Sequence, residues 1–120
     1  MALRPIHLLG SPVLRQHSAE VECVDDEVRA LVRDLFDTMY AAEGIGLAAN
    51  QVGLTKRVAV VHAGDDPAVV LINPVIEPLS DETSLAWEGC LSLPGMMGEV
   101  RRHTDIRYRG LGVDGETIVR

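Results

Sequence analysis

Two short stretches contain the residues best suited to chemistry. The first is "EGIGLAANQVG", residues 43–53, in which glycines and small apolar residues lead to the polar amide of Gln51. An amide N–H aimed at a developing oxyanion can stabilise a tetrahedral intermediate, and the glycines would let a substrate backbone approach closely. A simpler interpretation is also open: the glycines form a turn between a helix and a strand, and Gln51 is its exposed polar end.

The second stretch is "WEGCLSLPG", residues 87–95, which contains Cys90. A lone cysteine is commonly a buried structural thiol, but it can also be a metal ligand or a nucleophile. A nucleophile needs a base, and no histidine is spaced from Cys90 in a way that predicts pairing. One cysteine with scattered histidines also forms no recognisable zinc pattern. The candidate bases are His7, His17, His62 and His103.

The elements that must position these residues begin with an amphipathic helix. Apolar residues recur at helical spacing between positions 28 and 40, which predicts one face on a core. Three acidic residues at 25–27 suit the start of this helix, and Gly44 is expected to end it. A shorter helix is expected from Ser11 as N-cap and Pro12, ending near His17. The apolar residues of the main helix are Val28, Leu31, Val32, Leu35, Phe36, Met39 and Tyr40.

Strand signals follow the first stretch. Residues 57–63 and 68–76 are β-branched runs bounded by Gly, Asp and Pro, which predicts two strands. The Asn73-Pro74 pair within the second run predicts an edge strand or a bend. Residues 105–120 are typical of a hairpin with its turn at Asp114-Gly115, and the sequence given stops inside the return strand.

Composition limits the classes of function. A chain of 120 residues is one domain, and 47% hydrophobic against 24% charged residues excludes wholesale disorder. A net charge of −7 argues against nucleic-acid binding, and no window is apolar enough to span a bilayer. Two distant cysteines and the lack of a secretory signal predict a reduced, cytoplasmic setting.

Taken together and in this order, "GIGLAANQ" and "EGCLS" resemble the first two of the three motifs of the peptide deformylases. The likeness extends over essentially the whole chain through "LRPI", "DTMYAAEGIG", "LINPVI" and "VDGE". The resemblance implies an α+β fold with an N-terminal amphipathic helix and antiparallel β-sheets, which in the family pack around a C-terminal helix. On this resemblance, residues 1–120 are a single, truncated deformylase-like domain.

The resemblance also implies an activity, which is removal of the formyl group from the N-terminal formyl-methionine of newly made polypeptides, near the ribosome. Cys90 would be a thiolate ligand to a divalent metal, usually Fe2+, with Zn2+, Ni2+ or Co2+ able to replace it. Gln51 and the backbone N–H of Leu91 would bind the formyl oxygen. Three residues would align the substrate as an added strand and help to form the methionine pocket: Ile45, Gly46 and Gly89. Glu88 would pair with Arg102 and orient the loop that carries the cysteine.

The third family motif, His-Glu-x-x-His, is not in this sequence, which contains no His-Glu dipeptide. That motif provides two histidine ligands and a glutamate general base, and its helix packs between the sheets. We therefore expect the 120 residues alone neither to hydrolyse formyl peptides nor to fold stably as a monomer, with apolar sheet faces left exposed. The favoured explanation is a fragment of a complete deformylase. The alternatives are a non-catalytic peptide-binding module that uses strand addition, and a second chain that supplies the helix.

Overall fold

The computed structural model describes residues 3–113, 115 and 117–119. Two antiparallel sheets and a helix, α1 (Asp26–Ala41), make up most of this part of the chain, so the predicted α+β class is confirmed. The larger sheet has the order β1-β2-β3-β6-β7, and β4 pairs with β5 alone. The strands are β1 (Gly46–Ala48), β2 (Val58–Val61), β3 (Val69–Pro78), β4 (Thr83–Gly89), β5 (Met97–His103), β6 (Ile106–Leu111) and β7 (Thr117–Val119).

Among the described residues, helix α1 supplies five of the twelve buried core residues. Its first turn is capped by Asp25, whose Oδ1 accepts the Val28 N–H at 3.0 Å, as the acidic start predicts. The apolar face packs against β1 and β2, and Leu35 and Met39 are fully buried there. The full set of buried core residues is Val21, Val28, Leu31, Val32, Leu35, Met39, Leu47, Ala49, Val52, Val58, Val60 and Ile72.

The ends of both predicted helices differ from expectation. α1 ends at Ala41, before the expected Gly44, and Glu43 takes the left-handed conformation with φ 58°. The segment after Ser11 is a 3-10 helix, η1 (Pro12–Arg15). Ser11 precedes it as expected, but its hydroxyl makes no cap; Oγ lies 2.9 Å from Nδ1 of His7 instead.

The Asn73-Pro74 pair forms a bend inside the sheet. β3 lies between β2 and β6, so the edge alternative is wrong and the bend is confirmed by a register shift between Ile72 and Val75. Asn73 has φ 51°, and its side chain bonds the N–H and the C=O of Val21 at 2.7 and 2.8 Å. The bulge therefore joins β3 to the segment before α1.

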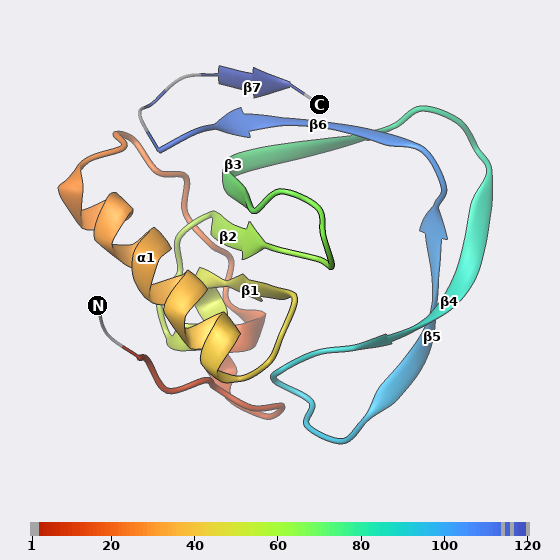
Figure 1. Ribbon diagram of the computed structural model, residues 1–120, viewed down its shortest axis with the longest axis horizontal. Coiled ribbons are helices and arrows are strands. Elements are labelled where there is room, and N and C mark those ends of the chain that lie inside the picture. Colours follow the sequence, from red (N-terminus) through yellow and green to blue (C-terminus); the bar gives the residue numbers. More distant parts are fainter. Residues whose placement is uncertain (1–2, 114, 116, 120) are drawn as a thin grey trace.

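β3 and β6 continue into β4 and β5 as one two-stranded ribbon. Where the ribbon turns, the Leu79 N–H donates to Asp105 O at 2.9 Å and the Thr104 N–H donates to Glu82 O at 3.0 Å. The ribbon then returns toward β1, and the loop between β4 and β5 lies close to the end of α1 (Figure 1). This tertiary path, not the spacing of residues, brings the second chemical stretch to the first.

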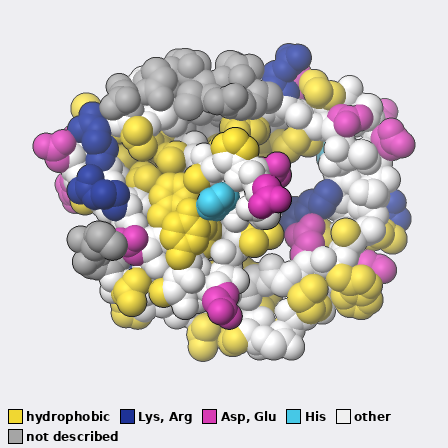
Figure 2. All heavy atoms as spheres, viewed as in Figure 1, with side chains coloured by type: hydrophobic (Ala, Val, Ile, Leu, Met, Phe, Trp, Pro, Cys, Tyr) yellow, Lys and Arg dark blue, Asp and Glu magenta, His cyan; other side chains and the backbone are white. Residues whose placement is uncertain are grey.

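Large hydrophobic side chains are exposed along this ribbon, as expected for the sheet faces. The molecule is hollowed between the α1 side and the ribbon, with hydrophobic side chains on both sides of the hollow (Figure 2). Within the described residues no helix is long and apolar enough to cross a membrane. The exposed ribbon residues are Val75, Ile76, Leu79, Leu85, Trp87, Met96, Met97 and Ile106.

The predicted hairpin at the end of the sequence is also present. β6 and β7 pair antiparallel, with Arg109 opposite Val119 and Leu111 opposite Thr117. The predicted turn residue Asp114 lies outside the described residues, whereas Gly115 has a left-handed φ of 82°.

The bulge gives a stability test. Replacing Asn73 by Ala removes both bonds to the buried Val21 backbone and places an alanine at positive φ, so we expect a loss of about 2–4 kcal/mol in the free energy of unfolding. Asn73→Gly keeps the backbone freedom and loses only the bonds, and it should cost less. Urea unfolding followed by far-ultraviolet circular dichroism measures both, and equal midpoints for the Ala variant and the wild type would contradict this account.

Candidate functional site

The Gly-rich stretch is a strand followed by a helical turn. β1 leads directly into a second 3-10 helix, η2 (Ala49–Val52), so the interpretation of residues 43–53 as a plain turn with an exposed Gln51 is wrong. Gln51 is half-buried, and its Oε1 accepts the Ala48 N–H at 2.9 Å. This bond fixes which way the amide N–H groups point.

The Gln51 amide reaches the second stretch. Its Nε2 lies 3.4 Å from Cys90 Sγ and donates to Ser92 Oγ at 3.1 Å. Glutamine and cysteine therefore share one site, as the resemblance implied, although they are separated by 39 positions. Each residue lies where a strand ends, Gln51 after β1 and Cys90 after β4.

Cys90 is an exposed free thiol, so the interpretation as a buried structural thiol is wrong. Histidines at three of the candidate positions have other neighbours: His7 bonds Ser11, His17 bonds Arg57, and His62 Nδ1 lies 2.7 Å from the Tyr40 hydroxyl. His103 is the last residue of β5 and is exposed. No histidine hydrogen bond to Cys90 is found in the part of the chain that the structure describes.

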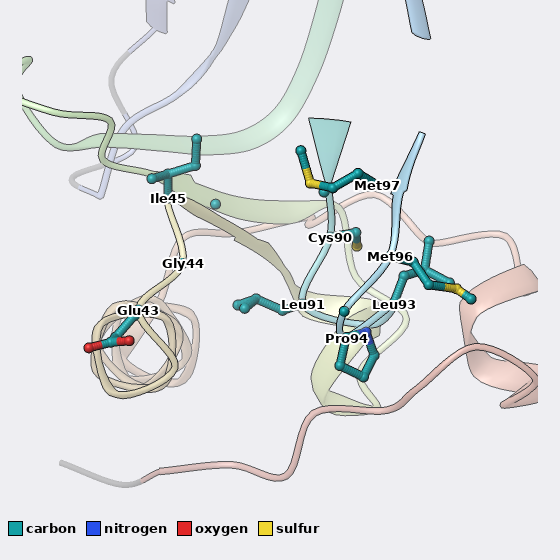
Figure 3. Close-up of a pocket in the computed structure, with 12 residues that line it drawn as sticks. Glu43, Gly44, Ile45, Cys90, Leu91, Leu93, Pro94, Met96 and Met97 are labelled. Carbon is teal, nitrogen blue, oxygen red and sulfur yellow. The ribbon is translucent and has the colours of Figure 1, made fainter. Parts of the chain in front are cut away.

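An open pocket of about 650 Å³ lies beside the thiol. One wall is formed by residues 43–46 and the other by residues 89–91 and 93–97, with Cys90 in the middle of the view (Figure 3). The expected substrate-aligning residues Ile45, Gly46 and Gly89 all line it, as does Leu91. Sequence reasoning missed the apolar residues of the second wall, which are Leu93, Pro94, Met96 and Met97.

The two walls touch at Gly44. A Cβ added to this glycine would lie 2.6 Å from Cδ1 of Leu91, a distance at which one of the two must move. The Leu91 side chain is directed toward Gly44 (Figure 3). Gly44 is therefore required for close approach of the second loop and not for a left-handed backbone.

Ser92 is a site residue that the sequence did not reveal. It is 4% exposed, its hydroxyl accepts from Gln51, and its carbonyl accepts the Leu9 N–H at 2.8 Å. Its only signal in the sequence was its place in "EGCLS", because a local sequence does not indicate which distant residue a serine hydroxyl will bond.

The predicted Glu88–Arg102 pair is confirmed. Arg102 donates through Nε and Nη2 to the two Glu88 oxygens at 3.0 and 2.8 Å. The bond from Arg102 lowers the pKa of the Glu88 carboxyl, and the same bond raises the pKa of the guanidinium. The pair joins β4 to β5 beside the loop that carries Cys90.

The described side chains do not by themselves fit a complete metal centre. The Cys90 thiol is a suitable soft ligand, but the described residues contain no group of three His, Cys, Asp or Glu able to hold an ion. One ligand cannot define the geometry of a catalytic metal.

Comparison with known proteins agrees with the two stretches. The family model for polypeptide deformylase matches residues 3–120. The peptide deformylase of Natranaerobius thermophilus is 44% identical, covering 99% of this chain and 76% of its own length. Peptide deformylase 1 of Clostridium acetobutylicum is 46% identical, with coverage of 99% and 78%.

Solved structures give the same result. The peptide deformylase of Thermotoga maritima superimposes with a TM-score of 0.94 at 34% identity, over 99% of this chain and 80% of that one. The Ehrlichia chaffeensis enzyme in complex with actinonin gives 0.96 at 35% identity, over 99% and 74%. On the match of residues 3–120 and of the fold, this chain belongs to the polypeptide deformylase family.

Proposed function

We propose that residues 43–53 and 87–97 form the substrate-binding and oxyanion-binding part of a peptide deformylase site. Deformylases are metal-dependent hydrolases that act on the formyl-methionyl ends of nascent polypeptides. The observation that carries the proposal is the Gln51 amide, which is held 3.4 Å from the Cys90 thiol at the edge of an apolar pocket.

Two N–H donors of this chain would bind the formyl oxygen. Hydrolysis of a formamide passes through a tetrahedral anion, and donors fixed in advance bind this anion better than they bind the planar substrate. The Gln51 amide is fixed in this way because Ala48 holds its oxygen. The second donor is the Leu91 backbone N–H, for which the described residues provide no acceptor.

The substrate would lie along β1. This strand pairs with β2 on one side only, so its other edge can accept an added peptide strand. Gly46 is the first residue of this strand, and Ile45, Gly46 and Gly89 all line the pocket. The methionine side chain would enter the apolar pocket, where unbranched side chains such as that of Met97 adapt to one another.

Cys90 would be one ligand of a divalent metal, for which we propose Fe2+ on the family resemblance. When bound, an ion of this kind would supply the activation of water for attack on the formyl group. No His-Glu-x-x-His motif is present to complete the ligand set or to act as general base. We therefore propose that these 120 residues carry part of a deformylase site and do not by themselves hydrolyse formyl peptides. We also propose a cytoplasmic location, which suits two free thiols.

Replacing Gln51 by Glu tests the oxyanion-binding role. Glutamate keeps an oxygen for the Ala48 N–H but replaces the N–H donor by an acceptor. The preference of the chain for a formylated peptide should therefore fall roughly tenfold. Titration calorimetry with formyl-Met-Ala-Ser, and with the same peptide lacking the formyl group, gives the ratio of the two dissociation constants.

Gln16→Glu is the matched control, since it makes the same chemical change at an exposed residue outside the site. An unchanged ratio in the Gln51 variant would contradict the role of the amide. Equal, tight binding of both peptides by the wild type would instead favour a non-catalytic peptide-binding module, for which the open edge of β1 is suited.

The incomplete ligand set predicts no turnover. Because a general base is worth about 10²–10⁴ in rate and the described residues form no metal centre, the purified 120-residue chain should release no formate from formyl-Met-Ala-Ser. Formate is measured by a coupled dehydrogenase assay after anaerobic addition of Fe2+, with metal content determined in parallel. Formate release with one ion per chain would refute this expectation.

The Glu88–Arg102 pair predicts a dependence of stability on pH. Because the pKa of Glu88 is lower in the folded chain than its usual 4.5, the pair stabilises the fold above that value, and the contribution is lost as the pH falls through the folded pKa. Urea midpoints followed by Trp87 fluorescence should decline below pH 4.5, and less steeply in Glu88→Gln.

Glu99→Gln serves as the control for this experiment, since it neutralises another carboxylate of the same hairpin for which no ion pair is found among the described residues. It should keep the wild-type decline. If the urea midpoints of the wild type and of Glu88→Gln decline equally below pH 4.5, the pair does not stabilise the fold.

A further inference from the structure

The first residues of the chain tie the two chemical stretches together. The His7 N–H donates to the carbonyl oxygen of Gln51 at 2.6 Å, and the Leu9 N–H donates to the carbonyl oxygen of Ser92 at 2.8 Å. Gln51 and Ser92 are themselves joined by the 3.1 Å bond between Nε2 and Oγ. These three bonds close a ring that contains residues 7–9, Gln51 and Ser92.

The ring fixes the direction of the Gln51 amide. A carboxamide nitrogen carries two hydrogens, and the hydroxyl of the buried Ser92 accepts one of them. The other is left on the side of Cys90 Sγ, 3.4 Å away. Because Ala48 holds the amide oxygen, rotation of the group would break the bonds at both of its ends.

The ring also sets the spacing of the two loops. The buried core residues come from the segments up to β3. Of the described residues in β4, β5 and the loop between them, only the polar Ser92 is buried, and Leu91 packs partly buried against the core. The loop that carries Cys90 is therefore held by a few specific contacts. The bond from Leu9 reaches the residue that also binds the Gln51 amide.

We propose that Leu9 and Ser92 are positioning residues for formyl-oxygen binding, and that residues 7–9, the N-terminal strap, hold the Gln51 amide against the Cys90 loop. The inference rests on the proposed role of Gln51. Leu9 acts through its backbone N–H, which reaches Ser92, since the residue is otherwise 63% exposed. Ser92 acts through the amide that it binds.

The turn at the strap allows the N–H of Leu9 to be removed by itself. The Ser11 N–H donates to Leu8 O at 3.0 Å, and Gly10 has φ 100°, as in a type II turn. Leu9 occupies the second position of this turn, where proline is favoured. Leu9→Pro thus fits the backbone and deletes the donor, whereas Leu9→Ala removes the same side chain and keeps the donor.

The test compares dissociation constants for formyl-Met-Ala-Ser and for the same peptide without its formyl group. Leu9→Pro and Ser92→Ala should each lower the preference for the formylated peptide two- to tenfold, roughly the value of one hydrogen bond. Leu9→Ala should keep the wild-type ratio. If the two residues serve only folding, their replacement would weaken the binding of both peptides equally. The ratio of the dissociation constants would then be unchanged, which would overturn the inference.

Amide hydrogen exchange in the unliganded chain gives an independent measurement. In the wild type and in Leu9→Ala, the N–H groups of residues 7 and 9 should exchange slowly, and fast exchange at either would overturn the ring. If the wild type shows no preference for the formyl group, the proposed function fails together with the inference. A preference that is lost in Gln51→Glu but kept in Leu9→Pro and Ser92→Ala would overturn the strap alone.

Discussion

The contact between the Gln51 amide and the Cys90 thiol is the interaction on which the site depends. At 3.4 Å it is a weak bond to sulfur, so it cannot hold two loops together. Its geometry is imposed by stronger bonds nearby, from Ala48 to the amide oxygen and from the amide to Ser92. The amide is thereby oriented before any ligand arrives, which is the condition under which a neutral donor stabilises a developing anion.

The two sides of the site differ in how they are supported. The Gln51 side is built on the main core, since β1 and η2 pack against α1 and Leu47 and Ala49 are buried. The Cys90 side is the end of a long ribbon whose hydrophobic residues remain exposed, Trp87 and Met97 among them. A few specific contacts fix this end: the Glu88–Arg102 pair, the close approach of Leu91 to Gly44, and the bonds that Ser92 makes.

Much of the main core could be predicted from local pattern. The apolar spacing of α1 and its acidic cap indicate which face is buried, and β2 and β3 follow from their β-branched runs. The Asn73-Pro74 pair marked an interruption, but not its place between two strands. Glycine at 44 was expected to end the helix, whereas Glu43 takes the left-handed conformation and Gly44 makes room for Leu91.

The sequence by itself determined the helix, the strand-forming runs and the two motifs that indicate the family, because periodicity and short motifs are local properties of a chain. Only the tertiary structure decided that Cys90 is exposed, that Gln51 reaches it, and that Ser92 and Leu9 hold the amide in place. The reason is physical: a backbone N–H is present at nearly every residue. Its partner is chosen by the path of the chain, so no side-chain pattern records it.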